Sequence, residues 1–238
     1  MNLRSANRIV GGAFINITSI PFMISIMLKG QHMCGGGILD EFSVVTAGHC
    51  AQEVVGRIHD VQVRSGSSYE DEGGIIHNVT KITVHENYNP DTNDYDIAVL
   101  KVNPPFKYDN STQSLTIAKN ESTDSDFGLI AGWGYFLDFD PVLSRQLQFV
   151  LLPKVQRDEC EKDYANEQKI VQTQVCYGFR NGGKDACKGD SGGPIVNMDH
   201  VLIGVTSWGD GCAEAGKPGV YTDAILLRDW IKKQIEKD

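Results

Sequence analysis

The sequence is short of positive charge and of long apolar runs. Its 22 lysines and arginines stand against 31 acidic residues, and the formal net charge of −9 disfavours nucleic acid and anionic membrane as partners. No apolar run approaches the roughly 18 residues that a membrane-spanning helix needs. The chain also has no Cys-x-x-Cys pair, internal repeat or proline-rich linker. These absences argue against a membrane span, a thiolate metal site and a repeat architecture.

Six cysteines are present, and the residues alone do not choose among their possible pairings. Disulfides form in oxidising compartments, so this cysteine set predicts a secreted, extracellular protein. Secreted proteins use Asn-x-Ser/Thr sequons for N-glycosylation, and four occur here, at Asn16, Asn78, Asn110 and Asn120. The first eight residues contain no apolar core of a signal peptide, and we expect that such a peptide was removed.

Length and pattern together predict a β-rich fold. With 238 residues, 41% of them hydrophobic, the chain can bury a large core as one domain or as two closely packed halves. Short β-prone runs between clusters of glycine, asparagine, aspartate and serine are typical of sandwiches or barrels. These runs are residues 21–28, 37–46, 61–66, 80–84, 96–102, 127–131, 146–153, 173–178, 194–197, 201–208 and 219–222. Residues 157–168 predict a short surface helix, and residues 224–236 have the apolar spacing of an amphipathic helix.

Residues 185–194, Asp-Ala-Cys-Lys-Gly-Asp-Ser-Gly-Gly-Pro, carry the main functional signal. A serine hydroxyl is a poor nucleophile unless a base lies beside it and amide donors face the developing oxyanion. Glycines on both sides of Ser191 allow bare backbone to approach a substrate carbonyl. His49 offers the base, and Asp96, at the start of an apolar run, offers a buried carboxylate to orient it. The order His, Asp, Ser along the chain is that of chymotrypsin.

Five motifs in this order resemble the trypsin-like serine proteases of the chymotrypsin family. They are Ile-Val-Gly-Gly from residue 9, Ala-Gly-His-Cys from 47, Asp-Ile-Ala from 96, Gly-Asp-Ser-Gly-Gly from 189, and Ser-Trp-Gly from 207 followed by Pro-Gly-Val-Tyr from 218. The resemblance covers residues 9–238 and implies an all-β fold. Two six-stranded antiparallel β-barrels, about residues 9–115 and 116–238, would pack face to face, with a C-terminal α-helix. Residues 1–8 would be an activation peptide.

The resemblance implies a role for each site residue. Ser191 is the expected nucleophile, His49 the general base and then acid, and Asp96 the residue that orients the imidazole. The nearby Asp94 is expected to be a solvated loop residue. The backbone N–H groups of Gly189 and Ser191 form the expected oxyanion hole. The implied disulfides are Cys34–Cys50, Cys160–Cys176 and Cys187–Cys212.

The specificity pocket is implied in the same way. Asp185 matches the pocket floor, where a buried carboxylate pairs with a basic substrate side chain. The other implied pocket residues are Ala186, Ser207, Trp208, Gly209 and Gly219. Trypsin has a serine where this chain has Ala186, and an ammonium needs that hydroxyl more than a bidentate guanidinium does. We therefore predict cleavage after arginine and, less well, after lysine.

The bond between Arg8 and Ile9 resembles an uncut activation site. In the family, its cleavage frees an α-amino group that pairs with the aspartate beside the nucleophile, here Asp190. The chain is therefore expected to be a zymogen that a protease activates. In some relatives a Ser–His pair holds that aspartate before cleavage, and Ser25 and His32 fall in the corresponding places.

The predicted function is that of a secreted serine endopeptidase that works through an acyl-enzyme. Ile-Leu-Asp-Glu-Phe from residue 38 and Asn-Gly-Gly-Lys-Asp from 181 resemble arthropod digestive trypsins and mite group 3 allergens, which implies a digestive role. Expected partners are polypeptides with Arg or Lys at the cleavage site, an activating protease and protein protease inhibitors, and the chain is expected to be a monomer. No cofactor and no metal are expected, because the acidic run 70–72 lies in a shortened version of the loop that binds calcium in vertebrate trypsins.

A second class of function stays open. Gly48, Lys188 and Thr206 depart from the residues common in the family, although none of these changes removes a catalytic group. The alternative is a catalytically weak or inactive paralogue that acts by binding, for example by interfering with host complement. The intact His49 and Ser191 argue against it.

Overall fold

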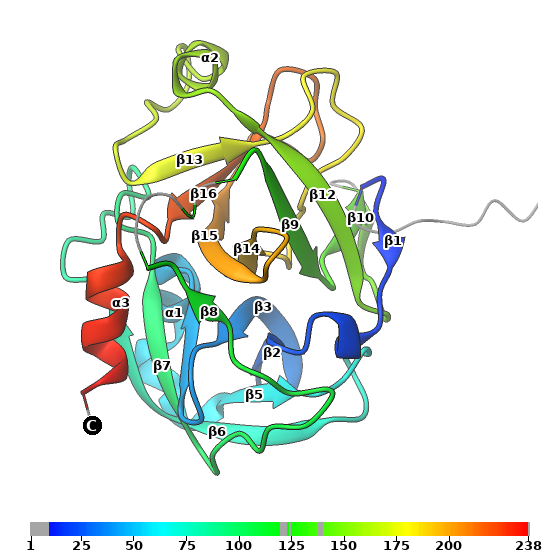
Figure 1. Ribbon diagram of the computed structural model, residues 1–238, viewed down its shortest axis with the longest axis vertical. Coiled ribbons are helices and arrows are strands. Elements are labelled where there is room, and N and C mark those ends of the chain that lie inside the picture. The colour runs from blue at the N-terminus through cyan, green and yellow to red at the C-terminus, as the bar shows by residue number, and fades with distance from the viewer. Residues whose placement is uncertain (1–9, 120–122, 124, 138–139, 238) are drawn as a thin grey trace, which may run out of the picture.

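Two barrels of short antiparallel strands stand one above the other (Figure 1). The structure is a computed structural model that describes residues 10–119, 123, 125–137 and 140–237. The lower barrel closes in the order β2-β3-β4-β7-β6-β5. Its strands are β2 (Met23–Leu28), β3 (Gln31–Ile38), β4 (Ser43–Thr46), β5 (Val61–Ser65), β6 (Ile75–Val84) and β7 (Ala98–Asn103). Successive side chains of a strand point alternately into the barrel and outward. In β5, for example, Val61 and Val63 are buried and the polar residues that follow them are half-exposed.

The upper barrel closes in the order β12-β13-β16-β15-β14-β9, with β9 pairing back to β12. Its strands are β9 (Phe127–Gly132), β12 (Gln148–Val155), β13 (Gln174–Tyr177), β14 (Pro194–Val196), β15 (Val201–Trp208) and β16 (Gly219–Asp223). The predicted all-β fold of two six-stranded barrels with a C-terminal helix is therefore confirmed. No described helix combines the length and the apolar character that crossing a membrane requires.

Shorter elements decorate the barrels. Four short strands lie outside them: β1 (Ala13–Phe14) on β12, β8 (Thr116–Ile117) on β15, and the hairpin of β10 (Tyr135–Leu137) and β11 (Asp140–Leu143). The helices are η1 (Ile17–Ser19), α1 (Gly48–Val54), η2 (Val55–Asp60), α2 (Arg157–Asp163) and α3 (Arg228–Ile235). Helix α3 lies against β7 of the lower barrel (Figure 1), so the end of the chain returns to the first barrel.

The barrels share one apolar core where they meet. The largest buried cluster includes Val44 and Leu100 of the lower barrel together with Leu202 and Val205 of the upper one. At the same seam, strand β3 runs against the backbone of the Ser191 segment. A Cβ atom on Gly35 would lie 3.0 Å from the Cα of Gly193, so this contact requires a strand without side chains at its closest point.

Three disulfides fasten loops to this frame: Cys34–Cys50, Cys160–Cys176 and Cys187–Cys212. The first joins β3 to α1 within the lower barrel, and the other two lie in the upper barrel. The described residues include no unpaired cysteine. Arg8, Ile9 and Asn120 lie outside the described residues, as does the whole predicted activation peptide.

Some element boundaries differ from the sequence-based predictions. The segment 37–46 was predicted as one strand, but a turn divides it between the end of β3 and all of β4. Residues 31–37 of β3, which include three glycines, lack the β-branched residues that mark a strand. The C-terminal helix begins at Arg228 rather than at 224, because the side chain of Asp223 accepts hydrogen bonds from the N–H groups of Ile225 and Leu226 and holds them in a turn.

Truncation of Leu100 tests the shared core. Leu100 is fully buried in β7, whereas Leu226 is 52% exposed, so the two leucines form a matched pair. We expect Leu100→Ala to lower the free energy of unfolding by about 2–5 kcal/mol and Leu226→Ala to change it by about 0.5 kcal/mol or less. Urea unfolding of proteins that also carry Ser191→Ala, which removes the predicted nucleophile, measures both. Equal losses would contradict the assignment of β7 to the core.

Candidate active site

His49 and Asp96 meet because two strand ends meet. Thr46, the last residue of β4, pairs with Ala98, the first of β7. Helix α1 starts directly after β4 and carries His49 at its second position, and Asp96 lies two residues before β7. The Nδ1 atom of His49 lies 2.8 Å from Oδ2 of Asp96, and the backbone N–H of His49 donates to Oδ1 at 2.7 Å. Asp96 is fully buried, while the His49 side chain is 33% exposed.

The carboxylate of Asp96 also receives a hydrogen bond from the second barrel. The hydroxyl of Ser207, in β15, donates to Oδ2 at 2.5 Å, and the hydroxyl of Thr222, in β16, donates to the backbone carbonyl of Asp96 at 2.8 Å. The sequence placed Ser207 only among the pocket residues. Its contact with Asp96 spans 111 positions, and no local pattern reveals it.

Asp94, the rival carboxylate, does not contact His49. It is half-buried and accepts a hydrogen bond from the hydroxyl of Thr173 in the upper barrel. The expectation of a solvated loop residue is therefore wrong in part, because the loop that carries Asp94 is tied across the seam. The N–H of Tyr95 also donates to that hydroxyl, at 3.2 Å.

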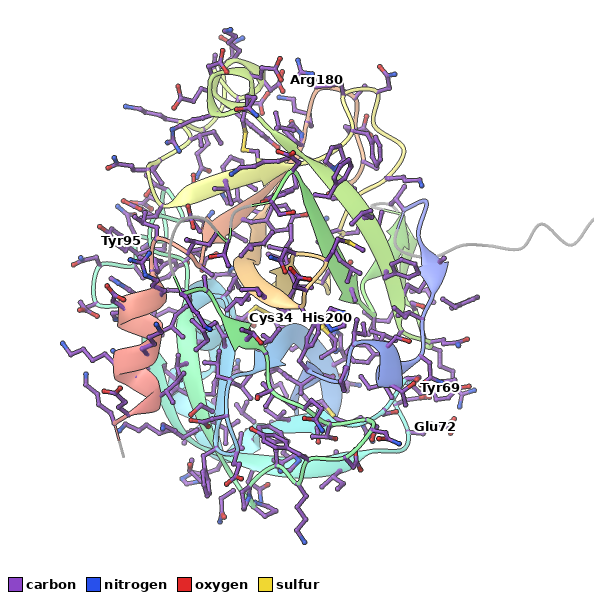
Figure 2. The ribbon with its side chains drawn as sticks, in the orientation of Figure 1. Cys34, Tyr69, Glu72, Tyr95, Arg180 and His200 are labelled. Carbon is purple, nitrogen blue, oxygen red and sulfur yellow. A yellow bond between two sulfur atoms is a disulfide. The ribbon has the colours of Figure 1, made fainter. Side chains whose placement is uncertain are left out.

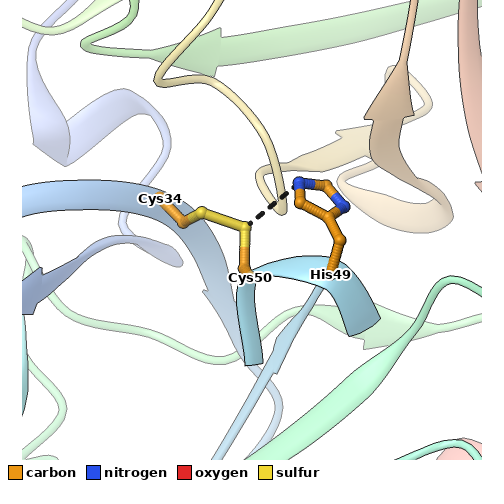
Figure 3. Close-up of side chains that lie close together, drawn as sticks. All are labelled: Cys34, His49 and Cys50. Carbon is orange, nitrogen blue, oxygen red and sulfur yellow. Dashed lines mark hydrogen bonds between the residues drawn. A yellow bond between two sulfur atoms is a disulfide. The ribbon is translucent and has the colours of Figure 1, made fainter. Parts of the chain in front are cut away.

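Ser191 and the His49 ring both lie close to the Cys34–Cys50 disulfide. The Nε2 atom of His49 is 3.5 Å from the sulfur of Cys50 (Figure 3), and that sulfur is 3.7 Å from the carbonyl oxygen of Ser191. No hydrogen bond between the His49 ring and the Ser191 hydroxyl occurs among the described contacts. The structure thus brings the nucleophile and the base candidates to one place without joining them directly.

Cys34, His49 and Cys50 are also the one group of possible metal ligands found among the described residues. Metal binding by cysteine requires a thiolate. The two sulfurs are bonded to each other, so neither offers a thiolate (Figure 3). The cluster is a packed disulfide beside a histidine.

Two backbone donors beside Ser191 are unused. Gly192 and Gly193 donate their N–H groups to Thr206 and Asp190, and Asp190 donates its own to Cys187. Within the described part of the chain, the N–H groups of Gly189 and Ser191 donate to no acceptor. Gly189 has a φ of +94°, a conformation that side chains disfavour, so a glycine is needed to present this pair. Unused donors flanking a serine fit an oxyanion site.

A cavity of about 370 Å³ opens beside Ser191. Asp185 lies in its lining and is only 4% exposed. Its carboxylate accepts hydrogen bonds from the N–H groups of Ala186 at 2.8 Å and Ala213 at 3.3 Å. Burial outweighs these bonds and raises the pKa of Asp185 to about 7. No described cation pairs with it, so the cavity holds a carboxylate that lacks a positive partner.

The remaining predicted pocket residues line the same cavity: Ala186, Ser207, Trp208, Gly209 and Gly219. Gly219 controls its depth, because a Cβ atom there would lie 2.9 Å from Oδ1 of Asp185 and 2.8 Å from the hydroxyl of Tyr221. A Cβ atom on Gly209 would meet only one backbone oxygen, at 3.6 Å. The missing side chain at 219 therefore leaves the route to Asp185 open.

Asp190, next to Ser191, does not line the cavity. It is fully buried, and its carboxylate accepts hydrogen bonds from the N–H groups of Gly134 at 2.8 Å and Cys187 at 3.0 Å. Burial raises the pKa of Asp190 to about 6. The acid is thus held by neutral donors, in a position where an added positive charge would be strongly favoured.

The Ser25–His32 pair is formed, but it does not hold Asp190 in this structure. The hydroxyl of Ser25 lies 2.7 Å from Nδ1 of His32, and Nε2 donates to the carbonyl oxygen of Gly189 at 2.8 Å. Burial lowers the pKa of His32, which favours the neutral ring. His32 therefore holds the peptide group between Gly189 and Asp190, next to the N–H of Gly189 that has no acceptor. The sequence did not indicate this role.

The three unusual residues lie around the site without blocking it. Gly48 begins α1, and a Cβ atom there would lie 3.1 Å from Oδ1 of Asp96. Lys188 is exposed at the rim of the cavity. Thr206 lies in the cavity wall, and its buried hydroxyl has no partner among the described residues.

The acidic run 70–72 lies at the edge of the lower barrel, where Tyr69 and Glu72 extend outward (Figure 2). The guanidinium of Arg145, from the upper barrel, lies 3.2 Å from Asp71 and 3.1 Å from Glu72, and it also covers the ring of Tyr69. A protein cation from across the seam therefore balances these carboxylates.

Comparison with known proteins agrees with this geometry. The sequence profile described as Trypsin matches residues 9–231. The chain belongs to the trypsin family. It is 39% identical to Trypsin 5G1 of Aedes aegypti over 234 residues, a match that covers 97% of this chain and 86% of the mosquito protein. It is also 39% identical to Hypodermin-B of Hypoderma lineatum and 36% identical to Vitellin-degrading protease of Bombyx mori, with 94% and 96% of this chain and 86% of each relative covered.

Membership of the trypsin family confirms the resemblance seen in the five motifs. The chain is a trypsin-like serine endopeptidase, a hydrolase that acts on polypeptides. Among its trypsin-family features, the structure displays the disulfides, the two barrels and the cavity beside Ser191.

Removal of the Ser207 hydroxyl tests how Asp96 is held. Ser207→Ala deletes one donor to a buried carboxylate, a bond worth about 1.5–3 kcal/mol, and we expect kcat/KM on an arginyl amide substrate to fall about tenfold. Ser43→Ala is the matched control, because Ser43 is another fully buried serine and its hydroxyl has no partner among the described residues. An unchanged kcat/KM in a folded Ser207→Ala protein would contradict this role.

Proposed function

We propose that the chain hydrolyses peptide bonds after arginine and, less well, after lysine. The observation that carries this proposal is the buried carboxylate of Asp185 in a deep cavity that opens beside Ser191. An apolar substrate side chain would leave that carboxylate desolvated and unpaired, whereas a guanidinium would pair with it. Gly219 keeps the cavity long enough for such a side chain.

The proposal gives each of the three side chains a catalytic role. The Oγ atom of Ser191 attacks the substrate carbonyl carbon, and its proton passes to Nε2 of His49, which then gives that proton to the leaving amine. Water then attacks the acyl-enzyme in the same way: His49 takes a proton from the water and gives it back to the Oγ atom of Ser191 as the acid product leaves. Asp96 fixes the ring with Nδ1 as donor and stabilises the imidazolium. The unused N–H groups of Gly189 and Ser191 receive the negative oxygen of the tetrahedral intermediate.

The chain is a zymogen in this proposal, and the activating cut falls between Arg8 and Ile9. Two features of the described residues support it. The carbonyl of Val10 accepts a hydrogen bond from the N–H of Asp185 at 3.2 Å, so the chain just past the cut runs beside the cavity segment. Asp190 is buried without a cation, and the α-amino group that the cut frees on Ile9 would supply one.

Secretion, glycosylation and a digestive role complete the proposal. Three disulfides support an oxidising compartment. Asn16, Asn78 and Asn110 are exposed and therefore accessible for N-glycosylation. The natural partners in this proposal are an activating protease, dietary polypeptides and protein protease inhibitors, and the protein acts as a monomer.

Turnover after controlled activation tests the function as a whole. A protease of known specificity is used to cut Arg8–Ile9, the new N-terminus is verified, and a chromogenic arginyl substrate is added. We expect turnover only after the cut, with full loss in Ser191→Ala. A verified cut and an intact fold without turnover would instead support the binding paralogue, which no feature of the site favours.

The preference for arginine over lysine is tested with Ala186→Ser. The wild-type cavity offers an ammonium no hydroxyl at position 186, so we expect kcat/KM for an arginyl peptide to exceed that for the matched lysyl peptide by about tenfold or more. Ala186→Ser restores the hydroxyl and is expected to narrow the ratio several-fold, mainly through the lysyl peptide. Equal rates on both peptides in the wild-type enzyme would refute the assignment.

Binding of a cationic inhibitor tests the charge state of Asp185. Its pKa of about 7 means that the carboxyl is neutral below that pH and charged above it. A bound cation favours the charged form, so affinity for benzamidine should fall as pH drops through about 7, by about tenfold for each further unit. Calorimetry of the cut protein measures this affinity without the contribution of turnover. Asp185→Asn should weaken binding at neutral pH and flatten the profile, and a flat wild-type profile would contradict the proposal.

A further inference from the structure

A second cavity, of about 240 Å³, lies between the lower barrel and the C-terminal helix. Strands β6 and β7 form one wall and α3 with the residues after it forms the other, on the side of the molecule where α3 packs in Figure 1. Three lysines line it, and we call this cavity the lysine pocket: Lys81 from β6, Lys101 from β7 and Lys237 beyond α3. It shares no lining residue with the cavity beside Ser191.

The strand register forces two of these lysines together. Lys81 and Lys101 are direct partners across the antiparallel pair of β6 and β7. Side chains at such positions start about 5 Å apart, and like charges directly opposite each other destabilise a sheet. Thr83 and Val99, the next pair on the same face, also line the cavity, so both lysines belong to the wall that faces α3.

Neutral groups hold the lysines whose contacts are described. The ammonium of Lys101 donates to the backbone carbonyl of Ile235 at 2.8 Å, and that of Lys237 donates to the side-chain oxygen of Gln234 at 3.3 Å. In the described part of the chain, neither Lys101 nor Lys237 forms an ion pair. The negative end of the α3 dipole favours them only in part, because a helix terminus carries about half a unit charge.

The sign of this cluster is opposite to that of the whole chain. The protein carries a formal net charge of −9, yet three lysines line one small cavity here, and Lys101 and Lys237 are held by neutral oxygens. Lysines offer mobile donors on flexible stems, and ammonium groups from three segments of the chain suit an anion with several equivalent oxygens. We propose that the lysine pocket binds a tetrahedral oxyanion, such as sulfate, either as the free ion or as a sulfate group on a polysaccharide.

Thermal unfolding with sodium sulfate tests the site. The protein carries Ser191→Ala to prevent self-digestion, and sodium sulfate replaces sodium chloride at constant ionic strength. We expect a saturable rise in Tm of about 2 °C or more. Sulfate also stabilises proteins by exclusion from their surface, so the decisive quantity is the difference between variants.

Lys81→Gln/Lys101→Gln should lose the saturable part of the shift. Lys237→Gln should weaken the saturable shift. Because it leaves both strands unchanged, it tests the site even if the double variant folds poorly. The matched control is Lys232→Gln/Lys233→Gln, which removes the same charge from exposed positions on α3 outside the cavity and should keep the full shift. The proposal is overturned if all variants show the same shift, or if the wild-type shift does not saturate.

A polymer arm separates the two sources of the anion. Dextran sulfate and uncharged dextran are immobilised, and retention of the same four proteins is compared. Retention on dextran sulfate that only the pocket variants lose supports a polysaccharide-borne sulfate. A saturable shift with free sulfate, combined with equal retention of all proteins, supports the free ion as the ligand. Because every arm uses the Ser191→Ala protein, the outcome does not depend on the proposed specificity.

Discussion

The burial of Asp96 is the constraint on which the rest of the site depends. A carboxylate with no exposed surface must find its hydrogen-bond donors within the protein, and here they come from both barrels. His49 supplies a backbone and a ring donor from the lower barrel, and Ser207 supplies a hydroxyl from the upper one. The Ser207 bond crosses the seam, and the cost of leaving it unmade helps to hold the barrels in one relative position. The geometry of the cleft therefore follows from the solvation of one acid.

Two further acids, Asp185 and Asp190, are buried within six residues of each other without a described cation. Each is held by two backbone N–H groups, which are too few to offset burial, and the pKa of each is raised. The chain thus stores unfavourable electrostatic energy close to the proposed nucleophile, Ser191. A cationic substrate would relieve it at Asp185, and a new α-amino group would relieve it at Asp190.

Much of this arrangement could be predicted from the sequence, and the limits have physical causes. Strand β15 has the predicted bounds, 201–208, because its apolar run is long and ends at turn residues. The sequence predicted only the end of strand β3, because its glycines reflect the close contact with the Ser191 segment and have low strand propensity. Motif order predicted His49, Asp96, Ser191 and Asp185 as site residues, and the structure joins His49 to Asp96 and places Asp185 and Ser191 in the lining of one cavity. The hydrogen bond from His32 to Gly189 joins residues 157 positions apart, and no local spacing encodes it.

Gly219 has a consequence for how this scaffold can change. One methyl group added there would lie against the carboxylate of Asp185, and the three atoms nearest to it belong to Tyr221 and Asp185 rather than to His49 or Ser191. Under the proposed function, one added carbon atom at position 219 would therefore change which side chains reach Asp185. A single mutation in this fold would alter substrate selection without replacing a residue that carries out the reaction.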